Sequence, residues 1–167
     1  MGVRETLNKQ PAITTGATIG IIVLALGFII WQVMGGGNHI QIPTKAYYTT
    51  DDGASYYKDD INLIAPYDYG GKQAVKADVF KCASGSEFVG YLERYTADAK
   101  KVIEDSRKNP GTEDFGKAAE AASRGLEVKA PLTGDTGWVK NYAAAASKII
   151  TVHCPGGGDQ PPEPILP

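Results

Sequence analysis

The pattern of apolar and polar positions divides the chain into two unlike parts. No Asp, Glu, Lys or Arg occurs between Gln10 and Thr44, and residues 12–34 are almost continuously apolar. A helix over these residues would be about 34 Å long, enough to cross a hydrocarbon core about 30 Å thick. The sequence therefore predicts a transmembrane helix over residues 12–34, preceded by residues 1–11 and followed by a glycine linker at 35–37.

The charges beside this span predict its orientation. Arg4 and Lys9 precede it, whereas the first basic residue after it is Lys45. Because short, positively charged ends stay in the cytoplasm, we expect a single-pass protein of the inner (plasma) membrane with a cytoplasmic N-terminus and an extracytoplasmic C-terminal domain. A secretory signal peptide cleaved near Gly35 is the alternative, although the apolar run exceeds the usual length of such a peptide.

Three glycines lie close to one side of the expected span. Gly16 and Gly20 form a GxxxG pair, and Gly27 follows seven residues after Gly20. Glycines allow two helix backbones to approach closely, and helix association in lipid depends on such packing. The membrane is thus the first expected partner. For the span itself there are two hypotheses: a homodimer formed through the glycine face, or a helix that remains monomeric.

Beyond the linker, shorter patterns predict an α+β domain over residues 38–155. Aromatic and β-prone residues at 46–50 and 55–58 flank a turn rich in Asp and Gly, which indicates a hairpin. Segments 73–82 and 86–95 are rich in Val, Phe and Tyr and flank a short turn, which indicates two more strands. A sheet of this size needs cover on at least one face.

Helical patterns follow these strands and supply the cover. Thr96 is the expected N-cap of a helix that Asn109 ends, and Thr112 the expected N-cap of a second helix that ends at Gly125. The second helix carries a stripe of mostly small residues, Phe115, Ala118, Ala119 and Ala122. The predicted fold is therefore a small, mostly antiparallel sheet of about five strands packed with two or three helices.

The last forty residues contribute three further expectations. A third helix is expected to begin at Asp135 or Thr136 and to run through Ala146, and a final strand to cover residues 149–154. Residues 156–167 contain several Pro and Gly and little apolar material, so we expect a disordered or extended tail there.

The turn of the first hairpin resembles a known motif. Residues 49–56 have the order Thr-x-Asp-x-Gly-x-Ser-Tyr, which resembles the Asp-box of sialidases and related propellers. The resemblance implies a tight turn in which the Asp side chain binds backbone amides and the aromatic ring packs beneath. Because this role is structural in the family, we expect a hairpin stabiliser and carry over no sialidase activity. The residues concerned are Thr49, Asp51, Gly53, Ser55 and Tyr56.

The two cysteines are the best candidates for a covalent feature. Cys82 and Cys154 both end predicted strands of the expected outer domain, and thiols in that compartment tend to be oxidised. A disulfide between them would close a loop of more than seventy residues and would stabilise a small domain by about 4 kcal/mol. The chain has no CxxC, which disfavours a reactive or metal-bound thiol.

Catalytic and metal-binding motifs are not found in the sequence. The 17 Lys and Arg do not outnumber the 19 Asp and Glu, so the chain has no excess of positive charge with which to bind nucleic-acid phosphates. G-x-S-x-G, H-E-x-x-H, P-loop and GxGxxG patterns are missing. His39 is far from His153 in sequence, and His153 and Cys154 would point to opposite faces of a strand. We therefore expect no nucleic-acid partner, no metal and no cofactor, and favour a protein that is not an enzyme.

Carboxylates leave two weaker hypotheses open. Asp78, Glu87 and Glu93 lie among the predicted strands and could supply an acid pair. The Asp-rich loop from Asp51 to Asp68 could serve a ligand-binding module or a hydrolase if it lay over a cleft. Such a function would need converging carboxylates and a raised pKa.

The leading hypothesis is a non-enzymatic, membrane-anchored protein of the cell envelope whose outer domain mediates protein interaction or assembly. The layout of a short basic N-terminus, one Gly-containing span and the segments YYTTDDGASYY and FVGYLERY resembles small bacterial single-pass membrane proteins with an extracytoplasmic domain. A minor pilin-like subunit is a further alternative, although the start of its helix lacks the expected processing pattern. The expected contact residues are the paired tyrosines of the first hairpin, Tyr47, Tyr48, Tyr56 and Tyr57, whose rings would otherwise cover the core of the sheet.

Overall fold

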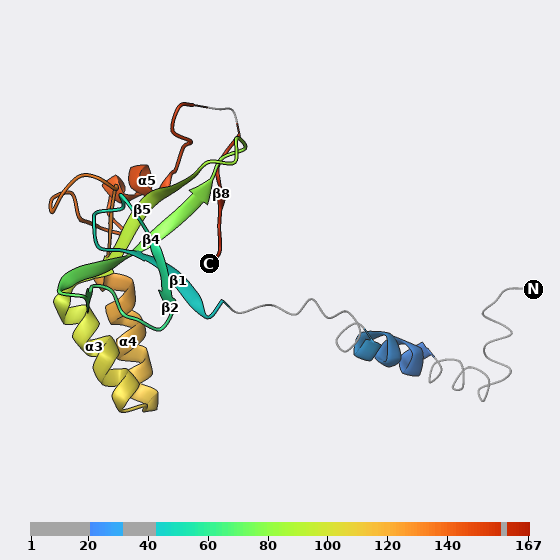
Figure 1. Ribbon diagram of the computed structural model, residues 1–167. Helices are drawn as coiled ribbons and strands as arrows, with labels where there is room; N and C mark the ends of the chain where they lie inside the picture. The colour runs from blue at the N-terminus through green and yellow to red at the C-terminus, as the bar shows by residue number, and fades with distance from the viewer. Residues whose placement is uncertain (1–20, 32–42, 158–159) are drawn as a thin grey trace, which may run out of the picture. The chain divides into compact units, whose positions relative to one another are not determined.

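A computed structural model describes residues 21–31, 43–157 and 160–167 of the chain (Figure 1). The chain divides into two compact units, Met1–Ile42 and Pro43–Pro167. Each unit is described by itself.

In the first unit, residues 21–31 form a helix whose side chains are all exposed. Within the ranges that the structure describes, no helix combines the length and the apolar composition that a bilayer crossing requires. The rest of the expected span, residues 12–20 and 32–34, lies outside the described residues, as do Gly16 and Gly20. A side chain added at Gly27 would meet no other atom within 4 Å.

The second unit is built on one antiparallel sheet, which confirms the α+β class and the mostly antiparallel pairing. The strand order is β2-β1-β4-β5-β6-β7, and β3 and β8 also pair with β4. There are eight strands rather than about five, because strands of two or three residues carry no periodic signal in the sequence. Their bounds are β1 Lys45–Thr49, β2 Tyr57–Asp60, β3 Tyr67–Tyr69, β4 Lys72–Lys81, β5 Glu87–Tyr95, β6 Leu126–Lys129, β7 Val139–Lys140 and β8 Glu163–Pro164.

Two hairpins form where the sequence predicts them. β1 and β2 pair with Tyr48 opposite Tyr57, and β4 and β5 pair with Ala77 opposite Leu92. The register of β4 and β5 shifts between Asp78 and Val79. A bulge of this kind lets the apolar side chains on both sides of it stay on the core face of a twisted sheet.

The apolar face of the sheet forms the core of the unit. Tyr47 from β1 packs there with residues of β4 that alternate with Lys76 and Asp78, and with residues of β5. The buried residues of this cluster are Tyr47, Ala77, Val79, Val89 and Leu92, and Tyr56, Val75, Trp138 and Ile165 pack against them.

Three helices, α3 Ala97–Lys108, α4 Thr112–Gly125 and α5 Ala144–Ile150, complete the unit. Figure 1 shows α3 and α4 as a helical pair at one end of the sheet. The Thr96 hydroxyl accepts a hydrogen bond from the Ala99 amide at 3.5 Å, as an N-cap does. α4 differs from expectation, because Gly111 is its N-cap and Thr112 is already helical. A Cβ at Gly125 would lie 2.0 Å from the Ala99 Cβ, so this glycine allows the two helices to meet closely.

The expectations for residues 135–154 were wrong in part. The segment expected to be one helix contains β7, and the helix that forms, α5, begins only at Ala144. Residues 149–154 are not a strand, because Ile149 and Ile150 end α5 instead. The Ala-rich run before these isoleucines has the highest helix propensity in this part of the chain, and it extends the helix over them.

The described residues of the tail include a short strand, β8. β8 pairs with the end of β4, with Phe80 opposite Pro164 and Lys81 opposite Glu163. The Ile165 amide donates to the Val79 carbonyl at 3.0 Å, and the Ile165 side chain packs against the core. The tail is ordered because it fills an edge of β4 that β1 leaves free.

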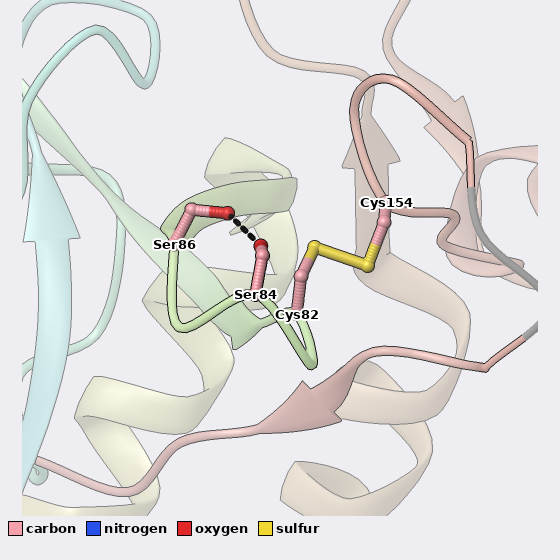
Figure 2. Close-up of a disulfide and its surroundings, with 4 residues drawn as sticks. All are labelled: Cys82, Ser84, Ser86 and Cys154. Carbon is pink, nitrogen blue, oxygen red and sulfur yellow. Dashed lines mark hydrogen bonds between the residues drawn. A yellow bond between two sulfur atoms is a disulfide. The ribbon is translucent and has the colours of Figure 1, made fainter.

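A disulfide joins Cys82 to Cys154, as the sequence predicts (Figure 2). The two Cα atoms are 5.8 Å apart although 72 positions separate the residues. Cys82 directly follows β4 and opens a turn in which the Ser84 and Ser86 hydroxyls lie 2.9 Å apart. The bridge therefore ties the far end of β4 to the segment that follows α5.

Candidate functional site

The charged face of β4 and β5 gathers the titratable side chains that are most perturbed. The antiparallel register places Lys76 opposite Glu93 and Asp78 opposite Tyr91, on the face that the apolar core does not use. Lys76 Nζ lies 2.7 Å from Glu93 Oε2 and 3.5 Å from Asp78 Oδ1. One lysine thus serves two largely buried carboxylates, and Asp78 Oδ2 is buried without a hydrogen-bond partner.

Burial and charge change the protonation of this group. Burial, together with the negative charge of Glu93, raises the pKa of Asp78 to about 6, and Lys76 offsets only part of this effect. Burial opposes the charged form of Lys76, but the carboxylates of Glu93 and Asp78 raise its pKa above the ordinary value. Burial also raises the pKa of the Tyr91 hydroxyl to about 12, and Asp78 adds to this. The face therefore holds a carboxyl group that can bind a proton near neutral pH.

Two hollows border the charged face, and Lys76 lines both. One, of about 230 Å³, is bounded by Asp78, Tyr91 and the tail residues 164–167. The other, of about 370 Å³, lies between the loop after β2 and the α3/α4 pair. We call the second hollow the helix groove. Its apolar lining comes from Ile61, Leu63, Ile64, Ile103, Ala118, Ala122 and Leu126.

We expect Asp78→Asn to raise the free energy of unfolding at pH 7 by about 2 kcal/mol. The pKa of Asp78 is raised on folding from 3.8 to about 6, so the folded state binds more protons than the unfolded state between these values. Native stability should thus fall as the pH rises from about 4 to about 6, and the variant should lose this dependence. Urea unfolding at a series of pH values measures both effects, and an unchanged pH profile would contradict them.

The helix α4, which contributes Ala118 and Ala122 to the groove, also carries an exposed aromatic side chain. Phe115 lies on α4, one turn before Ala118 and on the same side of the helix as Ala118 and Ala122. It is 77% exposed, and Ile61 on the opposite wall is also exposed. The alanine stripe predicted from the sequence therefore lines a hollow, because methyl groups are too small to fill it.

The residues of the Asp-box-like turn are bonded to one another. Asp51 Oδ1 accepts from the Thr49 hydroxyl at 2.7 Å and from the Ser55 amide at 2.9 Å, and its Oδ2 accepts from the Ser55 hydroxyl at 2.6 Å. The bonds from Ser55 hold the pKa of the Asp51 carboxyl below its ordinary value. The Tyr56 ring packs edge-on against Tyr47 at 5.1 Å. Gly53 has φ +86°, and a Cβ there would lie 2.8 Å from Pro131.

The paired tyrosines of the first hairpin mostly lie inside the unit. Tyr47 and Tyr48 are buried, the latter with only 1% exposure, and the Tyr48 hydroxyl donates to the Asp60 carbonyl at 2.9 Å. Tyr56 and Tyr57 are partly buried, and the Tyr56 hydroxyl donates to Glu87 at 2.8 Å. Glu87 is thereby engaged with the hairpin and lies apart from the charged face. The rings of this hairpin serve the core more than an outer surface.

The carboxylates between Asp51 and Asp68 do not converge on one point. Asp59 accepts from the Tyr67 hydroxyl at 3.2 Å, and Asp60 accepts from the backbone and side chain of Asn62. Asp68 accepts from the Gly71 amide at 3.3 Å. These carboxylates are bound by different groups, so the loop offers no shared acid pair.

A buried ion pair that sequence reasoning missed connects the hairpin turn to β6. Lys129 is only 4% exposed, and its ammonium group binds the Asp52 carboxylate and the Gly134 carbonyl. Asp52 Oδ2 also accepts from the Gly134 amide at 2.6 Å. The Lys129 ammonium lies 5.0 Å from the centre of the Trp138 ring. The Arg94 guanidinium lies 4.2 Å from the same ring centre. No pattern around Lys129 signals this burial, since a lysine in a short strand is usually exposed.

The second unit is thus an α+β domain with a disulfide, an internal ion pair and a charged sheet face between two hollows. Among the described residues, no three or more His, Cys, Asp or Glu side chains are grouped as a metal ion would require. His153 lines a shallow hollow with Ser147, Lys148 and Thr151, whereas His39 lies outside the described residues. Comparison with protein-family models, curated proteins and solved structures gave no match.

Proposed function

We propose that this chain is a non-enzymatic, membrane-anchored protein of the cell envelope whose outer domain binds another envelope protein. The observation that carries the proposal is the helix groove, whose largely apolar lining includes the exposed Ile61, together with the exposed Phe115 one turn before the lining residue Ala118 on α4. Large exposed apolar side chains beside a concave apolar surface are typical of protein contact sites.

The anchoring rests on residues 21–31. This helix carries aliphatic and aromatic residues all round, and each of its side chains is exposed. An isolated helix that is apolar on every side requires a nonpolar environment. The uncharged stretch between Gln10 and Thr44 and the basic residues before it support a single span with the second unit outside the cytoplasm.

The groove fits an apolar segment of a partner protein. Its lining comes from α3, α4, the loop after β2 and the sheet, which contributes the charged residues Lys76, Glu93 and Arg94, and the alanines of α4 keep it open. Arg107 lies at its edge, where its guanidinium donates to the Asn62 carbonyl. A partner helix with an apolar stripe and an acidic residue beside it would match this surface.

Cross-linking in intact cells tests the proposal. A membrane-impermeant amine-reactive reagent should join the lysines of the outer domain to a second protein, and Phe115→Ser should lower the yield of that product about tenfold, as for a central contact residue. Tyr142→Ser is the matched control, since Tyr142 is similarly exposed but lies between β7 and α5. A yield that Phe115→Ser leaves unchanged, or lysines that react only in broken cells, would refute the proposal.

Small-ligand binding is a second candidate function, favoured by one observation. The buried Asp78 Oδ2 has no hydrogen-bond partner, and Asp78 borders the hollow of about 230 Å³. A ligand that donates a hydrogen bond could satisfy this oxygen. In this candidate function the ligand-binding carboxylate lies on the charged face of β4 and β5, whereas the sequence had suggested the Asp51–Asp68 loop.

A further inference from the structure

We infer that the C-terminal segment of residues 160–167 exchanges between copies of this chain, so that the tail of one copy pairs with the β4 edge of a second copy. The inference rests on the proposed anchoring in one membrane, which holds the copies close together. The juxtaposition that carries it is the edge of β4 beyond β1, where β8 is seated.

The edge of β4 has a free stretch that accepts a strand. β1 pairs with β4 only at Val75 and Lys76, and β5 occupies the other side of β4. β8 pairs further along, at Phe80 and Lys81, and therefore on the same side as β1. Unpaired backbone groups at this edge would otherwise be open to any extended chain.

The chemistry of the tail matches this edge. The Ile165 amide donates to the Val79 carbonyl, and the Ile165 side chain packs on the core cluster. The Tyr47 hydroxyl donates to the Leu166 carbonyl at 3.4 Å. Because successive amides of a strand alternate in direction, the nitrogen of Pro164 faces away from β4, where a proline disrupts no pairing. Every copy of the chain carries this same segment.

The tail makes few contacts for a structural strand. β8 has two residues, and Leu166 remains 75% exposed. The segment is joined to the domain through Gly156 and Gly157, which have φ +93° and +82°, conformations that glycine adopts without strain. A short terminal strand of this kind is held largely by its covalent connection, which raises its local concentration at the edge. An identical tail on a neighbouring copy in the same membrane competes for the same edge, as in domain swapping.

Photo-cross-linking of two tagged forms of the full chain tests the exchange. Leu166 is replaced by p-benzoylphenylalanine in one form, the other form is unmodified, and both are expressed in the same cells. We expect a covalent product between the two forms, with the attachment mapped to Tyr47 or Phe80 of the unmodified form. Ile165→Asp in the labelled form should lower the yield about tenfold, because it removes the side chain that anchors the segment.

The same label at Tyr142 is the control and should give no product with the β4 edge of another copy. Attachment from residue 166 only within its own chain would overturn the inference, as would a product between copies that maps away from the β4 edge. The result can be interpreted even if the Phe115 experiment fails, because the attachment site reports contact at the β4 edge and does not depend on the helix groove.

Discussion

Replacing Cys154 by Ser is expected to lower the free energy of unfolding by about 4 kcal/mol. The bridge to Cys82 spans 72 positions and encloses β5, both long helices, β6, β7 and α5. Without the bridge, this large part of the unfolded chain is no longer covalently constrained. Closing a loop of this length removes much of the conformational entropy of the unfolded chain. Urea unfolding of the full chain, followed by the fluorescence of Trp138, measures the change.

Ser84→Ala is the matched control for this prediction. Ser84 lies in the turn next to Cys82, and its hydroxyl lies 2.9 Å from that of Ser86 on the surface (Figure 2). We expect a change of less than about 0.5 kcal/mol there. The reduced wild-type chain should match Cys154→Ser. Equal unfolding midpoints for the oxidised and reduced chains would disprove the stabilising role.

Asp52→Asn should destabilise the second unit by about 3 kcal/mol, because it leaves the ammonium of Lys129 buried without a counter-charge. Asn tolerates the φ of +60° that Asp52 adopts, and it keeps an oxygen for the Gly134 amide. The substitution therefore isolates the charge. Urea unfolding at pH 7 measures the effect.

Two further variants show whether burial of the charge is the cause. The double variant Asp52→Asn/Lys129→Met should regain most of the lost stability, since it leaves no uncompensated ion. Glu120→Gln removes the partner of Arg124 in an exposed ion pair of 3.2 Å and should change stability by less than about 0.5 kcal/mol. If Asp52→Asn were as mild as Glu120→Gln, the ion pair would not support the hairpin turn.

The parts of the fold that follow from local patterns were predicted well. The long strands β4 and β5 are rich in Val, Phe and Tyr and flank a short turn, and α3 has a capping threonine together with a buried stripe. The disulfide could be predicted because the chain has only two cysteines. The strands and the helix depend on residues that are close in sequence, and the disulfide depends on the only two cysteines of the chain.

The candidate site was predicted less well. Asp78 and Glu93 were noted as carboxylates on strands, but only the register of β4 and β5 shows that they share Lys76. The helix groove depends on the small side chains of Ala118 and Ala122, which the sequence indicates as a packing stripe. Whether such a stripe is filled depends on the loop that faces it, and that loop is distant in sequence.

Local patterns in the chain were enough to predict the uncharged apolar segment before residue 45, the α+β class of the second unit, its long strands and its first long helix. The reason is that residue periodicity, capping and chain polarity act over a few neighbouring positions. The burial of Lys129, the core position of Tyr48 and the packing of Ile165 on the core cluster are found only in the folded unit. Each of these depends on a partner more than ten residues away, and such a pairing leaves no periodic trace in the chain.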